Sequence, residues 1–134
     1  MTKDPVRAYL AGRGCSAELT KGGLHGLASR WEHVVDEVEE GYALGLDDYL
    51  NDMDLRDILE GALGVASGAD LGTMRARVDR ADERLRALTR ESKPLWGEDI
   101  AREHGHDPVH TWWYFRRPKR PGRVLSRDLS SNGL

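Results

Sequence analysis

Between residues 24 and 42 the apolar side chains recur at spacings of three and four, and this period restricts the fold more than any other feature. It is the period of one face of an α-helix. The apolar residues of the series are Leu24, Leu27, Trp31, Val34, Val35, Val38 and Tyr42. Gly41 follows the last turn, and glycine suits the left-handed conformation that ends many helices. The sequence therefore predicts a long amphipathic helix from Leu24 that ends in a glycine cap at Gly41.

A second periodic segment runs from Asp70 to Glu91. Its apolar residues, at alternating spacings of three and four, are Leu71, Met74, Val78, Ala81, Leu85 and Leu88. This narrow heptad stripe predicts a helix that packs against neighbouring helices, either of the same chain or of a second copy. Asp82 and Arg86 stand four residues apart and are expected to form an ion pair on its surface.

The stretch GLDDYLNDMDLRDILE, residues 45–60, combines acidic residues with a change of phase. Its apolar residues fall on two nearly opposite helical faces: Leu46, Tyr49, Leu50 and Met53 on one, and Leu55, Ile58, Leu59, Ala62 and Leu63 on the other. One straight helix that buries a single face cannot bury both sets, and Asp54 followed by Asp57 resembles a capping arrangement. We expect a bent helix pair: a short helix over 47–52, a corner, and a second helix to residue 63.

The two ends of the chain carry weaker patterns. Residues 1–19 show little periodicity, so a loosely ordered N-terminal segment with a short turn at residues 6–10 is expected. Residues 97–105 favour a short helix. In residues 105–134, Asp107 with Pro108 favours a helix start, but the following aromatics favour a strand, which leaves both structures open for 109–117. Because Pro118 and Pro121 favour extended backbone, we expect an extended aromatic and basic arm packed across the helices.

A chain of 134 residues with 39% hydrophobic residues fits one domain. We therefore predict a single all-α domain over residues 1–134. Cys15 is the only cysteine, so no intramolecular disulfide is expected. No apolar run approaches the roughly 18 residues that span a membrane, and the N-terminus lacks the apolar core of a signal peptide. A cytoplasmic protein without membrane contact is expected.

Charge is divided along the chain, although the net charge is only −3. Acidic residues dominate from Glu32 to Glu60, and arginine dominates beyond Met74. Complementary charged surfaces speed and select protein encounters. We expect a small non-catalytic protein-binding or regulatory module without a cofactor, which uses a charged helical face to bind another protein or to form a homodimer. The candidate partner-binding residues are Asp36, Glu37, Glu40, Asp47, Asp48, Asp52, Arg116 and Arg117.

An enzymatic alternative uses the same acids. Glu37 and Glu40 lie one turn apart, as do Asp48 and Asp52, and such pairs on facing helices could hold Mg²⁺ against phosphates. The pattern resembles the all-α nucleoside triphosphate pyrophosphohydrolases, in which a Glu-x-x-Glu helix faces a Glu-x-x-Asp helix. The matching positions are Glu37 and Glu40, then Asp48 with Asn51 or Asp52, and the resemblance implies Mg²⁺-dependent hydrolysis. This chain departs from the family's pattern in two ways. Its first motif lacks the full glutamate spacing, and its second motif has aspartate at the first position. Helix capping and exposed helix faces also account for the acids, and we adopt that interpretation.

Two further ligand classes have weaker patterns. Zinc could be bound by Glu103, His104, His106, Asp107 and His110, but no complete zinc pattern is present. Trp112, Arg116 and Arg117 could hold single-stranded nucleic acid by stacking and phosphate contacts. Because the acidic half would repel that ligand and large aromatics favour the core, nucleic acid is not an expected partner.

Overall fold

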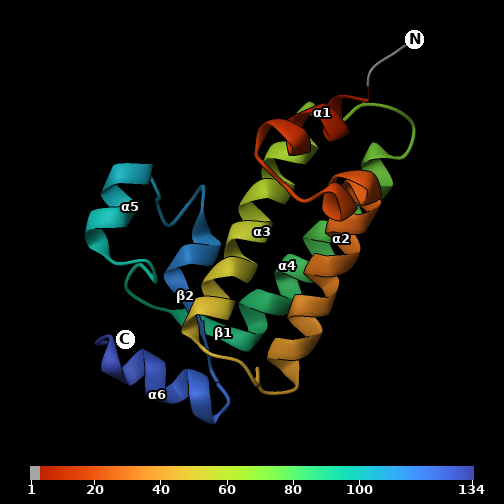
Figure 1. The fold of residues 1–134 in the computed structure, drawn as a ribbon. Helices are drawn as coiled ribbons and strands as arrows, with labels where there is room; N and C mark the ends of the chain where they lie inside the picture. Colours follow the sequence, from red (N-terminus) through yellow and green to blue (C-terminus); the bar gives the residue numbers. More distant parts are fainter. Residues whose placement is uncertain (1–3) are drawn as a thin grey trace.

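The computed structural model describes residues 4–134, and residues 1–3 lie outside the described part. This part is all-α, as predicted, apart from a two-stranded ribbon (Figure 1). Its elements are α1 (Pro5–Gly12), α2 (Ala17–Glu39), α3 (Leu46–Val65), α4 (Leu71–Leu88), β1 (Thr89–Glu91), α5 (Glu98–His104), the 3₁₀ helix η1 (Trp112–Phe115), β2 (Arg116–Pro118) and α6 (Arg123–Ser131).

The N-terminal segment forms a capped helix, so the expected loose order is wrong from residue 4 onward; for residues 1–3 that expectation lies outside the described residues. The Asp4 carboxylate accepts hydrogen bonds from the backbone N–H groups of Val6 and Arg7 at 3.0 and 3.3 Å. Val6 and Leu10 are buried in the common core. A single eight-residue helix holds too few apolar residues to give a visible period, which is why the pattern did not reveal it.

The long amphipathic helix is present as α2, and its predicted cap is confirmed. Gly41 adopts a φ of +105°. The Tyr42 N–H donates to the Glu37 carbonyl at 2.8 Å, and the Gly41 N–H donates to the Val38 carbonyl at 3.1 Å. This pair of bonds is the Schellman motif that satisfies the last carbonyls of a helix. α2 begins before Leu24, and Gly23 interrupts its helical backbone with a φ of 60°.

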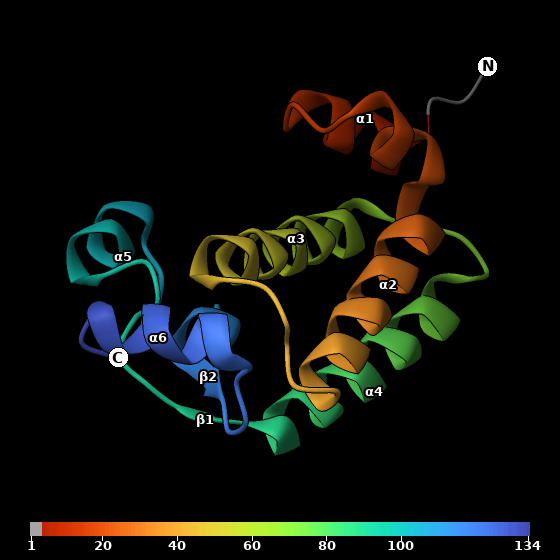
Figure 2. The ribbon, with the colours of Figure 1, turned by 60° about the horizontal axis from the view of Figure 1, so that its bottom comes forward.

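α3 is one continuous helix, and the predicted bent pair is wrong. It lies at the centre of the molecule (Figure 2), and α1, α2, η1 and α6 all contact it. Both apolar faces therefore find a partner, which removes the need for a corner. Its N-terminus is capped from a distance: the Leu46 N–H donates to Asp128 of α6 at 3.0 Å, across 82 residues of sequence.

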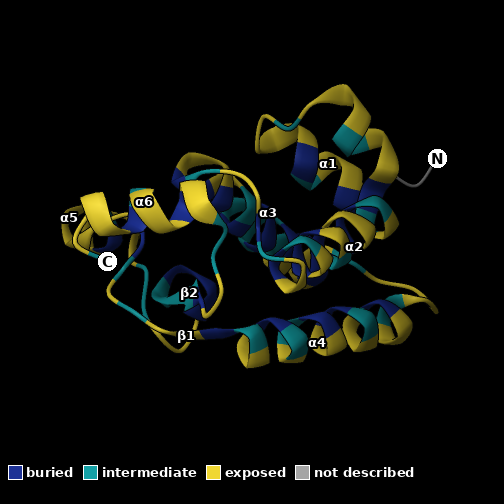
Figure 3. Cartoon of the chain, turned by 90° about the horizontal axis from the view of Figure 1, so that it is seen from below, coloured by how far each residue is buried: buried dark blue, intermediate teal, exposed yellow. Residues whose placement is uncertain are grey.

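The heptad stripe of α4 packs on α2 within the same chain. Met74, Val78, Ala81 and Leu85 are buried, whereas the outward side of α4 is exposed (Figure 3). The helix ends at Leu88 rather than Glu91, because residues 89–91 pair antiparallel with β2. The Thr89 hydroxyl also donates to the Leu85 carbonyl at 2.7 Å, so this backbone carbonyl in the last turn of the helix has a hydrogen-bond donor.

The C-terminal segment packs across α3 but is only partly extended. η1 places Trp112, Trp113 and Tyr114 in the core, and α6 adds Leu125 and Leu129. The extended arm is therefore wrong where η1 and α6 form, because an amphipathic turn buries these side chains better than an extended chain does. The short helix expected over residues 97–105 is confirmed as α5.

Within residues 4–134, no helix combines the length and the apolar character that crossing a membrane requires. Cys15 is a free, half-buried thiol.

Candidate functional site

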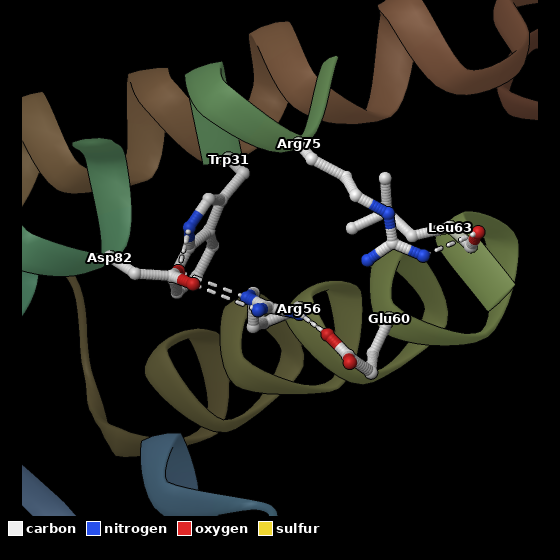
Figure 4. Close-up of polar contacts among 6 residues, drawn as sticks. All are labelled: Trp31, Arg56, Glu60, Leu63, Arg75 and Asp82. Atoms are coloured by element: carbon white, nitrogen blue, oxygen red, sulfur yellow. Dashed lines mark hydrogen bonds and ion pairs between the residues drawn. The ribbon is translucent and has the colours of Figure 1, made fainter. Parts of the chain in front are cut away.

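A polar network joins α2, α3 and α4 (Figure 4). Arg56 of α3 binds Asp82 of α4 through Nε and Nη2 at 3.0 and 2.8 Å. The Trp31 indole N–H donates to the same carboxylate at 2.9 Å, and Arg56 also donates to Glu60 at 2.8 Å. Burial acts to lower the pKa of Arg56, but the bonds to Asp82 and Glu60 outweigh it and the pKa is raised. These contacts fix three helices to one another.

The predicted pair of Asp82 with Arg86 is wrong, because Asp82 turns inward to Arg56. The Arg86 guanidinium instead lies over the Trp112 ring, 4.0 Å from its centroid. At that distance the cation is attracted by the face of the ring. Arg75 completes the contacts drawn in Figure 4 by donating to the Leu63 carbonyl at 3.2 Å.

Arginines of α4 pair with the acidic side of α2. Arg84 binds Asp36 at 2.8 Å and Glu39 at 3.2 Å. Arg77 binds Glu32, and this contact lowers the pKa of that carboxyl. Asp36, a candidate partner-binding residue, thus has a partner within the chain.

The other acidic candidates are distributed over separate surfaces. Glu37 and Asp52 line a groove of about 250 Å³, where Glu37 lies 3.0 Å from His33 and Asp52 accepts a 2.5 Å bond from the Tyr42 hydroxyl. Burial raises the pKa of Asp52, and the charges of Glu37 and Asp48 add to the rise. Asp47 lines a different groove, of about 380 Å³. The candidate residues Glu40 and Asp48 are exposed.

The carboxylates that match the pyrophosphohydrolase pattern do not come together as a cage. Glu37 and Asp52 share a groove, whereas Glu40, Asp48 and Asn51 do not line it. In the described range, no three His, Cys, Asp or Glu side chains are arranged so that they could hold a metal ion. The zinc candidates are likewise split: His110 binds Asp107 at 2.9 Å on an exposed turn, while His104 and His106 line a cleft.

Arg116 and Arg117 have different surroundings. Arg116 donates to the Thr89 hydroxyl and carbonyl, both at 2.9 Å, and to the Arg86 carbonyl at 3.2 Å. It therefore provides hydrogen bonds to backbone carbonyl groups at the end of α4. Burial lowers the pKa of Arg117, and Arg90 on the opposite strand lowers it further. Trp112 is buried beneath Arg86. This arrangement leaves no exposed stacking platform at Trp112 for a nucleic-acid base.

The cleft between α3, α5 and η1 is the best candidate for a binding site. It has a volume of about 400 Å³, within the range of small-molecule pockets. α3 supplies carboxylates, α5 and its flanking loops supply aromatic and histidine side chains, and an arginine follows α1. The lining residues are Arg13, Asp54, Asp57, Ile58, Trp96, Ile100, His104, His106 and Tyr114.

Asp54 positions the aromatic wall of the cleft. Its Oδ1 accepts a hydrogen bond from the Tyr114 hydroxyl at 2.6 Å and a longer one from the Trp96 indole N–H at 3.3 Å. Burial raises the pKa of Tyr114, and the bond to Asp54 adds to the rise. Because α3 is continuous, Asp54 lies in mid-helix and is not a cap, contrary to the prediction.

Asp57 lies one turn further along α3 and faces Arg13. Their closest side-chain atoms, Oδ2 and Nη2, are 3.6 Å apart. Arg13 also donates to the Tyr9 hydroxyl at 2.9 Å. The loop after α1 is therefore connected to α3 across the rim of the cleft.

His106 forms a stack with Tyr114 and His104. The His106 ring lies 4.0 Å from the Tyr114 ring at an interplanar angle of 10°, and 5.8 Å from the His104 ring. Its Nδ1 atom is buried and has no hydrogen-bond partner. Burial lowers the pKa of His106, the nearby His104 adds to this effect, and the charges of Asp57 and Asp54 oppose it. The neutral imidazole is therefore favoured.

Sequence reasoning selected His104 and His106 but as zinc ligands, and it assigned Asp54 and Asp57 to capping. Arg13, Trp96 and Tyr114 were not selected. The only local signal was the i, i+3 spacing of the two aspartates, which places them on one helical face. What covers that face depends on α5 and η1, which begin 41 and 55 residues after Asp57 in the chain.

The chain matches no protein-family model, no curated protein and no solved structure.

Proposed function

We propose that this protein is a non-catalytic binding module and that its partner is bound in the cleft between α3, α5 and η1. The observation that carries the proposal is the convergence of two carboxylates, Asp54 and Asp57, with the aromatic side chains of Trp96 and Tyr114 around a hollow of about 400 Å³. A pocket with hydrophobic walls and a few oriented polar groups is typical of a binding site.

The internal ion pairs favour the cleft over the acidic face of α2. Arg84 and Arg77 already pair with Asp36, Glu39 and Glu32. A partner that bound there would have to displace these arginines. The carboxylate of Asp57, in contrast, has only the 3.6 Å contact with Arg13 among residues 4–134.

The cleft chemistry favours binding over catalysis. A hydroxyl, thiol or amine nucleophile has to be held against a base that activates it. Among the lining residues the only hydroxyl is that of Tyr114, and it donates to Asp54 with a raised pKa. That environment stabilises the protonated phenol and does not activate it.

The test is a ligand titration followed by NMR on ¹⁵N-labelled protein. The probes are N-acetyl-arginine amide, indole-3-propionamide and phenyl phosphate, which are cationic, neutral and anionic. We expect at least one to shift the Trp96 indole N–H resonance saturably and to remain chemically unchanged over a day. The absence of any saturable shift, or conversion of a probe, would contradict the proposal.

A cleft-filling variant and a matched control locate the binding. Ile100→Trp places a larger side chain in the cleft and should abolish the probe-induced shifts of the Trp96 resonance. Val109→Trp makes the same kind of change at a side chain that is 76% exposed and outside the cleft lining. The control should bind as the wild type does; equal loss in both variants would place the binding elsewhere.

A further inference from the structure

We propose that the cleft receives a guanidinium group, presented as an arginine side chain by a partner protein. This inference rests on the proposed function and adds the chemical class of the occupant. Four observations support it: the charge of the lining, the free carboxylate oxygens, the aromatic wall, and the position of an arginine of the chain itself.

The charge of the cleft favours a cation. The formally charged groups of the lining are the two carboxylates of Asp54 and Asp57 and the one guanidinium of Arg13. The formal charge is therefore −1. The lowered pKa of His106 agrees with this count, because it keeps that ring from adding a positive charge at neutral pH. An anionic ligand would be repelled by this lining.

The two carboxylates can accept more hydrogen bonds than they receive. Both bonds to Asp54 end on Oδ1, so its Oδ2 accepts none from the described residues. Asp57 Oδ2 lies 3.6 Å from Arg13, and Oδ1 accepts no bond within that same part of the chain. One helical turn separates the two side chains, whose Cβ atoms are therefore about 5–6 Å apart. The five N–H donors of a planar guanidinium can bridge two such groups.

The aromatic wall suits a flat cation. Trp96 is the one tryptophan classed as exposed in residues 4–134, with 36% of its surface accessible, and its indole N–H is oriented by Asp54. A guanidinium is weakly hydrated and stacks on aromatic faces, and tryptophan attracts cations most strongly. An ammonium group is attracted by the charge of the cleft and by the ring face, but it cannot stack flat on the ring. The wall therefore favours arginine over lysine.

Arg13 shows that the rim accommodates a guanidinium. Its side chain, 43% exposed, lies near Asp57 and 5.8 Å from the Tyr9 ring centroid. It also competes for Asp57, so its removal should strengthen binding of an external cation. The rim residues His104 and Trp96 are exposed, which leaves the cleft accessible to a side chain carried on a polypeptide.

The test compares N-acetyl-arginine amide with N-acetyl-citrulline amide by calorimetry and NMR. Citrulline has nearly the same shape without the charge. We expect the arginine probe to bind about tenfold more tightly, the difference that a charged hydrogen-bonded pair can supply. Binding should weaken as salt is raised from low to physiological concentration. Agmatine distinguishes a free small molecule from an arginine that a protein carries. If agmatine binds and the capped arginine does not, the occupant is a free small molecule and the partner-protein assignment is overturned.

Two variants with opposite expected effects on arginine binding test whether the binding depends on the charges of the cleft. Asp57→Asn should weaken arginine binding about tenfold, whereas Arg13→Gln should strengthen it. Asp99→Asn is the charge-matched control, because its side chain is 98% exposed on α5 and lies outside the cleft lining. The ¹H–¹⁵N spectrum of each variant verifies the fold. Should Asp57→Asn prove unstable, the gain expected in Arg13→Gln still decides the question.

The two proposals fail differently. If citrulline or phenyl phosphate binds in the cleft as tightly as arginine, the site stands and the guanidinium assignment is wrong. If no probe binds there, both are wrong. Equal loss in Asp57→Asn and Asp99→Asn would mean that the overall charge attracts the cation, and this outcome also overturns the assignment.

Discussion

Gly122 is the glycine that lies closest to backbone atoms of another segment. A Cβ atom at this position would lie 2.5 Å from the Tyr42 carbonyl oxygen and 2.6 Å from that of Gly41. Both neighbours are backbone atoms of the segment that ends α2, so neither can rotate away. We expect Gly122→Ala to lower the free energy of unfolding by about 1–3 kcal/mol, the usual result of overpacking. Chemical denaturation measures it.

Gly64→Ala is the matched control for that substitution. Gly64 lies in α3 with no atom within 4 Å of a built Cβ. Alanine favours the helix over glycine by about 0.5–1 kcal/mol, so this variant should be slightly more stable than the wild type. Destabilisation of both variants to the same extent would contradict the steric explanation.

His106 should make stability depend on pH. Its pKa is lower in the folded protein because burial disfavours the charged ring. The unfolded chain therefore binds more protons between the lowered value and the ordinary one near 6.5, and stability rises with pH across that window. It is lost as the pH falls from above about 6.5 towards the lowered pKa.

The measurement is urea denaturation at several pH values for the wild type and His106→Phe. Phenylalanine keeps a ring against Tyr114 but cannot titrate, so the rise between about pH 5 and 7 should be smaller in the variant. Parallel pH profiles would rule out His106 as the source.

At the level of secondary-structure elements, two arginines test what connects the helices. Arg56 is buried between α3 and α4, and its loss leaves the largely covered Asp82, whose side chain is 13% exposed, without its cation. We expect Arg56→Ala to destabilise by about 3–5 kcal/mol. Arg84 connects α4 to α2 with a side chain that is 41% exposed, so Arg84→Ala should cost at most about 1 kcal/mol. Thermal and urea unfolding compare the two variants.

An equal loss of stability in both variants would show that burial does not set the strength of these pairs. Trp31 provides a further readout, because its indole N–H donates to Asp82. In Arg56→Ala the carboxylate loses its neighbouring charge, and the Trp31 indole N–H resonance should shift. In Arg84→Ala it should stay in place.

For the whole molecule, we expect a monomer. The heptad stripe of α4 is covered by α2 of the same chain, so it is not available to a second copy. The exposed large hydrophobic side chains lie at separated positions in the sequence: Leu44, Val65, Trp96, Val109 and Val124. Light scattering coupled to size exclusion should give a mass near 15.0 kDa. A mass twice as large would show that another surface forms a dimer.

The sequence by itself determined the local elements. The apolar period identified α2 and α4, and Gly41 identified the end of α2, because both signals depend on residues within one or two helical turns. The all-α class followed from the same patterns. Helix α1 was too short for such a signal, and Thr89 ended α4 earlier than the period indicated because a strand partner lay elsewhere in the chain.

Only the tertiary structure decided what each face contacts. The period of α3 shows two apolar faces, but it cannot show that α1, α2, η1 and α6 together cover both of them, so a corner was inferred where one continuous helix forms. The cap on α3 comes from Asp128, and the cleft joins Arg13, Asp54, Asp57 and Trp96 from three parts of the chain. The physical reason is that periodicity records whether a face is buried, while the identity of its neighbours depends on contacts between residues that are distant in sequence.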